Sequence, residues 1–220
     1  MADEQDVLLR EIDEELKQER LHKLWDRYGN YAISGALALV IGVAGIKGWQ
    51  SYDLDKRMEQ GERFAAAEKS AMDGKSEDAL SALKGLTKDA GQGYAMLARF
   101  RVAALTGEKG NAAGAAGLYG LLAEDAALDV VYRDLAVVLG ALQELDSTGN
   151  GGPLVARATK LAKAKSAWRY NAREVEALAA LAKGETKAAG AIFKELSSAA
   201  GVPQGVHARA REMLNITGNN

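Results

Sequence analysis

The hydrophobic and polar positions divide the chain into three parts. Near the start, apolar residues such as Leu9, Ile12 and Leu16 recur at helical spacing among many charged residues. Residues 28–46 form the second part and contain no Asp, Glu, Lys, Arg or His. From residue 51 onward, helical patterns of ten to twenty residues alternate with glycine-containing breaks. No run alternates apolar and polar residues as a strand would, so the pattern predicts an all-α protein.

The uncharged residues 28–46 predict a membrane-spanning helix. As a helix rising about 1.5 Å per residue, they would extend about 28 Å, close to the hydrocarbon thickness of a bilayer. Aromatic residues, which favour the membrane interface, flank the run at both ends: Trp25, Tyr28 and Tyr31, then Trp49 and Tyr52. Two alternatives stay open, a buried core helix and a cleaved signal peptide. We prefer an uncleaved anchor at residues 28–50, because the segment before it is long for a signal peptide.

The charged flanks predict the orientation of this anchor. Within fifteen residues of the run, four basic residues precede it and three follow it: Lys17, Arg20, Lys23 and Arg27, then Lys47, Lys56 and Arg57. Basic residues favour the cytoplasmic side, and a short charged leader is harder to translocate than to leave behind. We therefore expect residues 1–27 to form a cytoplasmic amphipathic helical leader and residues 51–220 to lie across the membrane.

Small residues recur at helical spacing inside the anchor, at Ser34, Ala38, Gly42 and Gly45. Such a stripe lets another membrane helix approach closely. We expect it to pack on a partner helix or on a second copy of the chain, which would make a homodimer.

The third part of the chain repeats itself. A turn glycine is followed at offsets of 5, 9 and 12 by residues suited to a helix–helix contact. The copies are Gly74, Ala79, Leu83 and Leu86; Gly110, Ala115, Tyr119 and Leu122; a degenerate Gly149, Leu154, Ala158 and Leu161; and Gly184, Ala189, Phe193 and Leu196. A period near 34 to 37 residues is typical of tetratricopeptide-like helix pairs.

This spacing predicts an α-solenoid of about four helix pairs. The expected pairs are 54–73 with 76–89, 92–106 with 111–123, 128–146 with 153–165, and 169–183 with 186–199. A C-terminal capping helix at 204–217 follows, with Pro203 near its first turn. The alternative is a plain helical bundle without solenoid curvature.

Composition supports the helical prediction and excludes several function classes. The chain has 42 alanines and only two prolines, a mixture that favours closely packed helices. Its formal net charge of −2 gives no general attraction to nucleic acid. The absence of cysteine excludes thiol nucleophiles and cysteine-ligated metals.

No catalytic, cofactor or metal site is expected. His22 and His207 fall on opposite sides of the predicted membrane, so they cannot share a site. Adjacent carboxylates such as Glu77 and Asp78 point to different helix faces and do not converge. We therefore expect a protein that is not an enzyme. The alternative class is a soluble helical enzyme with an unrecognised site.

One cluster gathers large residues in a chain that has few of them: Trp168, Arg169, Tyr170 and Arg173. Tryptophan, tyrosine and arginine are over-represented in protein-binding hot spots. The cluster is a candidate partner-binding site. Alternatively, Trp168 covers the apolar edge of the preceding helix pair.

The chain as a whole resembles a known family, the bacterial membrane-anchored tetratricopeptide-like proteins that act as an ancillary subunit of the Sec translocon. The resemblance is carried by the leader "REIDEELKQERLHKLWDRYGNY", by the glycine-rich anchor after it, and by the segment "AWRYNAREVEALAALAKGETKAAGAIFKELSSAAGVPQGVHARAREML". This last segment is similar to the α-proteobacterial versions. The repeats here are more degenerate and richer in alanine than standard tetratricopeptides.

The resemblance implies a single-pass inner-membrane protein with a cytoplasmic amino end and a periplasmic repeat domain. It implies a non-catalytic scaffold that assists protein export. Its implied partners are Sec translocon subunits and a membrane-tethered periplasmic chaperone of the prolyl-isomerase type. A scaffold for envelope assembly or cell division with the same topology is the alternative.

Overall fold

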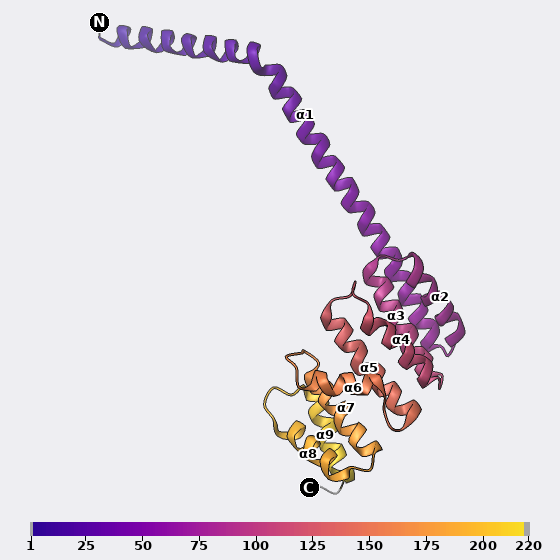
Figure 1. Cartoon of the computed structure of the whole chain (residues 1–220). Coiled ribbons are helices and arrows are strands. Elements are labelled where there is room, and N and C mark those ends of the chain that lie inside the picture. The colour runs from indigo at the N-terminus through magenta and orange to yellow at the C-terminus, as the bar shows by residue number, and fades with distance from the viewer. Residues whose placement is uncertain (1, 218–220) are drawn as a thin grey trace. The chain divides into compact units, whose positions relative to one another are not determined.

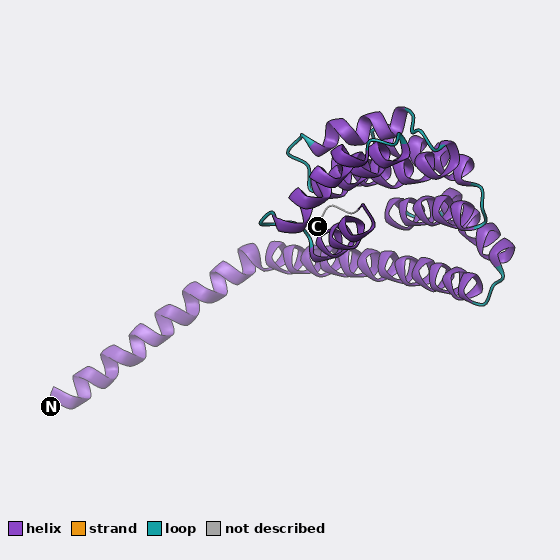
Figure 2. Ribbon diagram, turned by 90° about the horizontal axis from the view of Figure 1, so that it is seen from below, coloured by secondary structure: helices purple, strands orange, loops and turns teal. Residues whose placement is uncertain are grey.

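The computed structural model describes residues 2–217, apart from the side chains of residues 2–18, 20, 21, 32, 36 and 217. These residues form nine helices and no strand (Figure 2). The helices are α1 (Ala2–Met72), α2 (Ser76–Asp89), α3 (Gln92–Glu108), α4 (Ala112–Glu124), α5 (Val130–Thr148), α6 (Pro153–Ala162), α7 (Arg169–Ala182), α8 (Thr186–Ser198) and α9 (Gln204–Thr217). The predicted all-α class is confirmed.

The chain forms two compact units, Met1–Met58 and Glu59–Asn220. The first consists of the greater part of α1, which continues without a break through the leader and the uncharged stretch. No proline occurs before Pro153, so no residue of α1 lacks the backbone N–H that a helix needs. The leader's apolar face, Leu9, Ile12 and Leu16, lies outside the described side chains.

The second unit begins with the last part of α1, which is the first helix of the first pair. Ala67 is buried against α2 and α3, and the Phe64 and Tyr94 rings lie 6.2 Å apart. The Gln60 side chain accepts a hydrogen bond from the Gly91 N–H at 3.0 Å, just before α3 begins. The sequence predicts a helix beginning at residue 54. In the structure no turn separates it from the anchor, because neither a proline nor a turn glycine interrupts this stretch.

The four predicted turn glycines all adopt the left-handed conformation that favours glycine. Their φ values are 78° at Gly74, 84° at Gly110, 69° at Gly149 and 78° at Gly184. A side chain would be strained at these positions, which explains why glycine marks each turn. The residues at offset 5 are all buried. So are those at offsets 9 and 12, except for the half-buried Leu161.

In the degenerate third copy, the small and the large residue exchange offsets, and the facing helix α5 compensates for the exchange. Leu154 takes the offset where the other copies have alanine, and Ala158 takes the offset of the large residue. Gly140 of α5 makes room for the Leu154 side chain. A Cβ at residue 140 would lie 2.7 Å from Leu154 Cδ1 and 2.8 Å from Tyr119 Cβ. The close packing of this pair therefore depends on a glycine in the middle of a helix.

The helices pack in chain order, each on the next from α2 to α9, and α7 also lies beside α5 and α9 (Figure 1). Three clusters of buried residues follow one another, formed by α1 to α3, α3 to α7, and α7 to α9. Contact with near neighbours alone is typical of a solenoid. The predicted array of four pairs with α9 as its last helix is confirmed.

One predicted helix end was wrong. We expected the second helix of the third pair to reach residue 165, but α6 ends at Ala162. Lys163 and Ala164 instead donate to carbonyls three residues back, in a tightened last turn. At the other predicted boundary, Pro203 directly precedes α9, and its carbonyl accepts from the His207 N–H at 3.0 Å.

Candidate functional site

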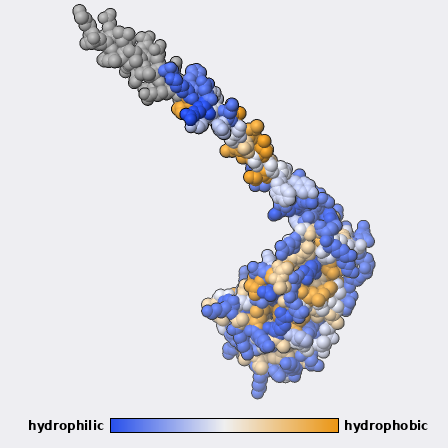
Figure 3. All heavy atoms as spheres, turned by 45° about the horizontal axis from the view of Figure 1, so that its top comes forward, coloured by the Kyte–Doolittle hydropathy of each residue, from blue (hydrophilic) through white to orange (hydrophobic). Residues whose placement is uncertain are grey.

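The uncharged stretch of α1 presents its apolar side chains outward. Leu39 is 67% exposed, and Ile33, Leu37 and Ile41 are comparably exposed. Within the described range His22–Met72, only 6% of the most apolar 18-residue window is buried. Figure 3 shows the apolar band between more hydrophilic segments of the helix. This helix is long and apolar enough to cross a membrane.

The small-residue stripe of the anchor lies on one exposed helix face. Ser34, Ala38, Gly42 and Gly45 are all exposed. A Cβ added at Gly42 or Gly45 would meet no atom within 4 Å. The face is therefore open to another helix, and packing through it stays a prediction.

Trp168 connects two helix pairs. It immediately precedes α7 and is half-buried against the cluster formed by α3 to α7. Its indole N–H donates to the Val131 carbonyl of α5 at 2.8 Å. Ser166 strengthens this connection, since its hydroxyl donates to the Asp134 carboxylate at 2.7 Å. The tryptophan thus covers the apolar edge of the preceding pair, as the packing alternative expected.

Tyr170 connects α7 to the loop before α9, and Arg169 packs against Tyr170. The Tyr170 hydroxyl donates to the Ala200 carbonyl of this loop at 3.3 Å. The Arg169 guanidinium lies 4.2 Å from the centre of the Tyr170 ring. Both side chains therefore have internal contacts, while Arg169 remains exposed. Partner binding by this cluster stays a prediction.

Arg173 joins α7 to α8 and reaches the edge of a groove. Its guanidinium donates to Glu176 at 2.6 Å and to Glu195 of α8 at 2.7 Å. Burial lowers the pKa of Arg173, but the hydrogen bonds to Glu195 and Glu176 outweigh this effect and hold the pKa above its ordinary value. The ion pairs fix the Glu176 carboxylate at one end of the groove.

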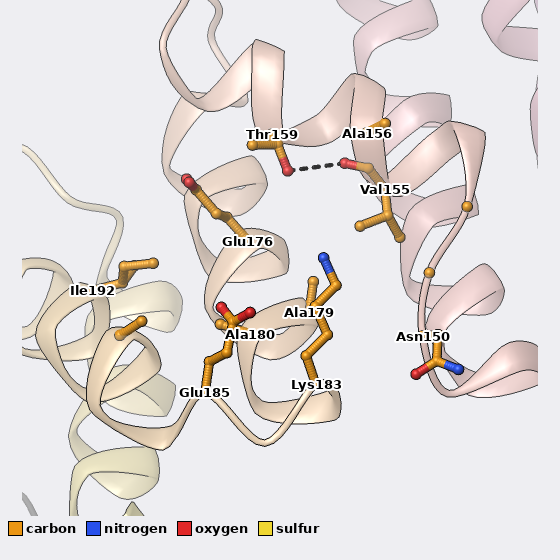
Figure 4. Close-up of a pocket in the computed structure, with 13 residues that line it drawn as sticks. Asn150, Val155, Ala156, Thr159, Glu176, Ala179, Ala180, Lys183, Glu185 and Ile192 are labelled. Carbon is orange, nitrogen blue, oxygen red and sulfur yellow. Dashed lines mark hydrogen bonds between the residues drawn. The ribbon is translucent and has the colours of Figure 1, made fainter.

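The groove lies along α6, α7 and α8 and has a volume of about 420 Å³. Val155 of α6, Ala179 and Ala180 of α7 and Ile192 of α8 form its apolar lining (Figure 4). The two alanine side chains are small, so the groove can take a larger apolar side chain from outside. Polar and charged side chains also line the groove, so it is a concave surface of mixed polarity, as binding sites on proteins often are.

Two alanines line the groove at positions where the preceding pair has larger residues. Ala179 and Ala180 lie five and four residues before the turn glycine Gly184. At the same distances before Gly149, α5 carries a glutamate and a leucine, Glu144 and Leu145. Leu145 packs against the core cluster of its own pair. Ala180 is buried in the cluster formed by α7 to α9, and its small side chain lines the groove.

Charged and polar groups stand along the groove. Glu176, Lys183 and Glu185 contribute charge, and Figure 4 shows the Lys183 ammonium turned toward the space between α7 and α6. Neither Lys183 nor Glu185 forms a salt bridge with a described residue. The Thr159 hydroxyl donates to the Val155 carbonyl at 3.1 Å, so it is engaged within α6. The groove therefore offers one cation and one anion to a partner.

Glu144 holds the first turn of α6, and with it one side of the groove. Its carboxylate accepts a hydrogen bond from the Val155 N–H at 2.8 Å. Gly152, at the start of α6, has no side chain that could do this. The side chain of α5 therefore caps α6 from across the pair, as a local capping residue would.

Sequence reasoning missed the groove residues Val155, Ala179, Ala180, Lys183 and Glu185. The repeat alignment contained a usable signal. Extended backward by four residues from each turn glycine, it gives Ser70, Thr106, Leu145 and Ala180, so the loss of volume appears against the preceding pair. The signal is hard to see because alanine is the commonest residue of the chain.

Groups that could perform chemistry do not gather in the described part of the chain. No three of its His, Cys, Asp and Glu residues are grouped so that they could hold a metal ion. The His207 ring lies 3.0 Å from Arg211 on the exposed side of α9. Glu77 pairs with Lys109, which lowers the pKa of Glu77 mainly through the hydrogen bond.

Comparison with known protein families matches residues 22–195 to the tetratricopeptide repeat-like domain. The chain belongs to this family. The match covers most of the chain and includes the apolar stretch of α1 and the four helix pairs up to residue 195, within α8. No curated protein and no solved structure matches.

Tetratricopeptide repeat-like domains mediate protein–protein interaction and are typically non-catalytic scaffolds. The chain therefore joins a protein-interaction fold to a helix that is able to cross a membrane.

Proposed function

We propose that this protein is a membrane-anchored, non-catalytic scaffold that assists protein export at the Sec translocon of the bacterial inner membrane. In this proposal residues 1–27 are cytoplasmic, residues 28–50 cross the membrane once, and residues 51–220 form a periplasmic repeat domain. The repeat domain recruits chaperones or exported clients. Its partners are translocon subunits and a membrane-tethered periplasmic chaperone.

The observation that carries the proposal is the continuity of α1. One helix, Ala2–Met72, contains the exposed apolar stretch and also supplies the first helix of the first repeat pair. A repeat domain joined to an anchor in this way stays near the membrane. Its effective concentration toward membrane-bound partners is raised without any added affinity.

The grooved surface of the repeat domain supports a scaffold role. The groove along α6, α7 and α8 is apolar at its floor and charged at its edge. Such a surface fits an apolar side chain of a polypeptide whose flanking groups are polar. The exposed Arg169 and its neighbours Trp168, Tyr170 and Arg173 are a second binding surface in this proposal. The stripe of Ser34, Ala38, Gly42 and Gly45 packs the anchor against a membrane helix of a partner or of a second copy.

The topology is tested with reporter fusions. An alkaline phosphatase fused after residue 220 is expected to be active, because this enzyme requires an oxidising compartment. The same reporter fused after residue 20 is expected to be inactive. The reverse pattern would contradict the proposed orientation. Extraction with alkaline carbonate should leave the protein in the membrane, whereas release would favour a soluble or peripheral enzyme.

The partners are tested by crosslinking in intact cells, followed by mass spectrometry. A photoreactive residue at Ala188, exposed on α8 beside the groove, is expected to yield translocon subunits or a periplasmic chaperone. The same residue at Ala82, exposed on α2, is the matched control. Products from envelope-assembly or division proteins alone would replace the export role with that alternative. If neither position yields a membrane or periplasmic partner, the scaffold proposal is contradicted.

A further inference from the structure

An uninterrupted basic segment lies in the middle of this slightly acidic chain. Residues 147–173 contain six Lys and Arg residues and no Asp or Glu. The basic residues are Arg157, Lys160, Lys163, Lys165, Arg169 and Arg173. The segment begins at the end of α5 and covers all of α6, the loop after it and the start of α7.

The positive charge is concentrated at the carboxyl end of α6. Lys160, Lys163 and Lys165 are exposed, and none of them forms a salt bridge with a described residue. Several arginines elsewhere in the repeat domain are instead bound to carboxylates. Arg101 contacts Glu68 at 2.7 Å, for example, and Arg209 contacts Glu174 at 2.6 Å.

A shallow hollow lies beside these lysines, between α5 and α6. It measures about 290 Å³ and is lined by Asp134, Val137, Arg157, Lys160, Leu161 and Ala164. Asp134 accepts a hydrogen bond from Ser166, so its carboxylate is already engaged. Arg157 donates to the Ala123 carbonyl at 3.3 Å and lies 3.9 Å from Glu124. The apolar floor of the hollow thus lies directly beside Lys160 and Arg157.

We propose that the surface formed by Arg157, Lys160, Lys163, Lys165 and the adjoining hollow binds an acidic polypeptide segment that carries an apolar side chain. The carboxylates lie against the lysines, and the apolar side chain enters the hollow between Val137, Leu161 and Ala164. This inference rests on the proposed scaffold function and specifies the chemistry of one partner.

Charge and shape together select this kind of partner. The cations attract carboxylates and raise the rate of encounter, while the apolar hollow rewards a side chain that leaves water. A flat anionic surface such as a bilayer can contact the lysines but cannot fill the hollow. The net charge of −2 also gives the whole molecule no attraction toward extended polyanions.

The test measures binding of a fluorescent peptide of glutamates with a single central leucine to the full chain in an uncharged detergent. The wild-type chain is expected to bind it, and added salt should weaken the binding because exposed charges are screened. A peptide with glutamine in place of every glutamate should not bind. Lys160→Gln with Lys163→Gln should weaken binding about fivefold, and the corresponding change to glutamate roughly tenfold or more.

The control variant is Lys84→Gln with Lys88→Gln, which removes two exposed lysines from α2 and should change binding less than about twofold. Ala164→Trp fills the hollow. It should abolish the advantage of the leucine peptide over an all-glutamate peptide while leaving the salt dependence. Circular dichroism of each variant separates a loss of binding from a loss of folding.

Three outcomes would overturn the inference. These are no binding of the acidic peptide, equal losses in the α2 control, and a loss of binding in the Lys160→Gln, Lys163→Gln variant for phosphatidylglycerol vesicles but not for the acidic peptide. The last outcome would assign the lysines to lipid headgroups. A different result would refute the scaffold function: crosslinking of the wild-type chain in cells that yields neither translocon subunits nor a periplasmic chaperone. Retained crosslinks with no peptide binding would refute this inference alone.

Discussion

The third and fourth helix pairs share one repeat pattern but fill their interiors differently. In the third pair, Leu145 packs into the core and Glu144 caps α6. In the fourth, Ala179 and Ala180 take the matching positions and leave a groove. Both pairs have a left-handed turn glycine, but the third pair reverses the sizes of the residues 5 and 9 positions after it. The two pairs therefore differ on both sides of the turn, and Ala179 and Ala180 of the fourth line the groove along α6, α7 and α8.

The largest expected effect on stability comes from truncating the large apolar residue that packs inside each of these two helix pairs. Phe193 is fully buried in the fourth pair, and Leu154 fills the third from a different offset. Phe193→Ala is expected to lower the free energy of unfolding by about 3–5 kcal/mol and Leu154→Ala by about 2–5 kcal/mol. The measurement is urea denaturation followed by circular dichroism. Leu121→Ala, at an exposed leucine of α4, is the control and should stay within about 0.5 kcal/mol. A loss below about 1 kcal/mol at either buried site would show that the two residues are not equivalent fillers.

The next effect tests the glycine that makes room for Leu154. Gly140→Ala places a Cβ within 2.8 Å of Leu154 and Tyr119 atoms and should destabilise the protein by about 1–3 kcal/mol. Gly117→Ala is the matched control, because Gly117 lies on the exposed side of α4 with open space around it. That change should stabilise by about 0.5–1 kcal/mol through helix propensity. Combining Gly140→Ala with Leu154→Ala should cost less than the sum of the two. Additive losses would contradict the proposed compensation.

The repeat architecture could be predicted because its determinants are local. A turn glycine and the residues 5, 9 and 12 positions later fix each helix pair, and these lie within a short stretch of sequence. The fit of Gly140 against Leu154 and the cap of α6 by Glu144 join different helices, so no local pattern reveals them. The groove is hidden for another reason. It is lined by the small side chain of Ala180, which is hard to recognise as a signal among 42 alanines.

A smaller effect tests the cap that the third pair has and the fourth lacks. Glu144→Ala removes the acceptor of the Val155 N–H and should lower the free energy of unfolding by about 0.5–2 kcal/mol. Glu144→Gln keeps an oxygen acceptor and should lose less. Glu185 precedes α8 and its side chain caps nothing there, so Glu185→Ala is the control, with a change within about 0.5 kcal/mol. Denaturation curves of the three variants provide the comparison. Equal losses for Glu144→Ala and Glu185→Ala would remove the distinction between the two pairs at this position.

The smallest effect on stability comes from making the fourth pair resemble the third. Ala180→Leu restores the residue type that α5 carries at Leu145, and the groove of about 420 Å³ has room for it. The free energy of unfolding should change by less than about 1 kcal/mol, because the added methyl groups fill open space instead of displacing packed atoms. Crosslinking from Ala188 should nevertheless fall sharply, since the apolar floor that a partner side chain would contact is then covered. Ala82→Leu on the exposed face of α2 adds the same side chain elsewhere and should leave those crosslinks unchanged. Undiminished crosslinking in a stably folded Ala180→Leu variant would show that the difference between the two pairs is one of packing alone and that partners bind at another surface.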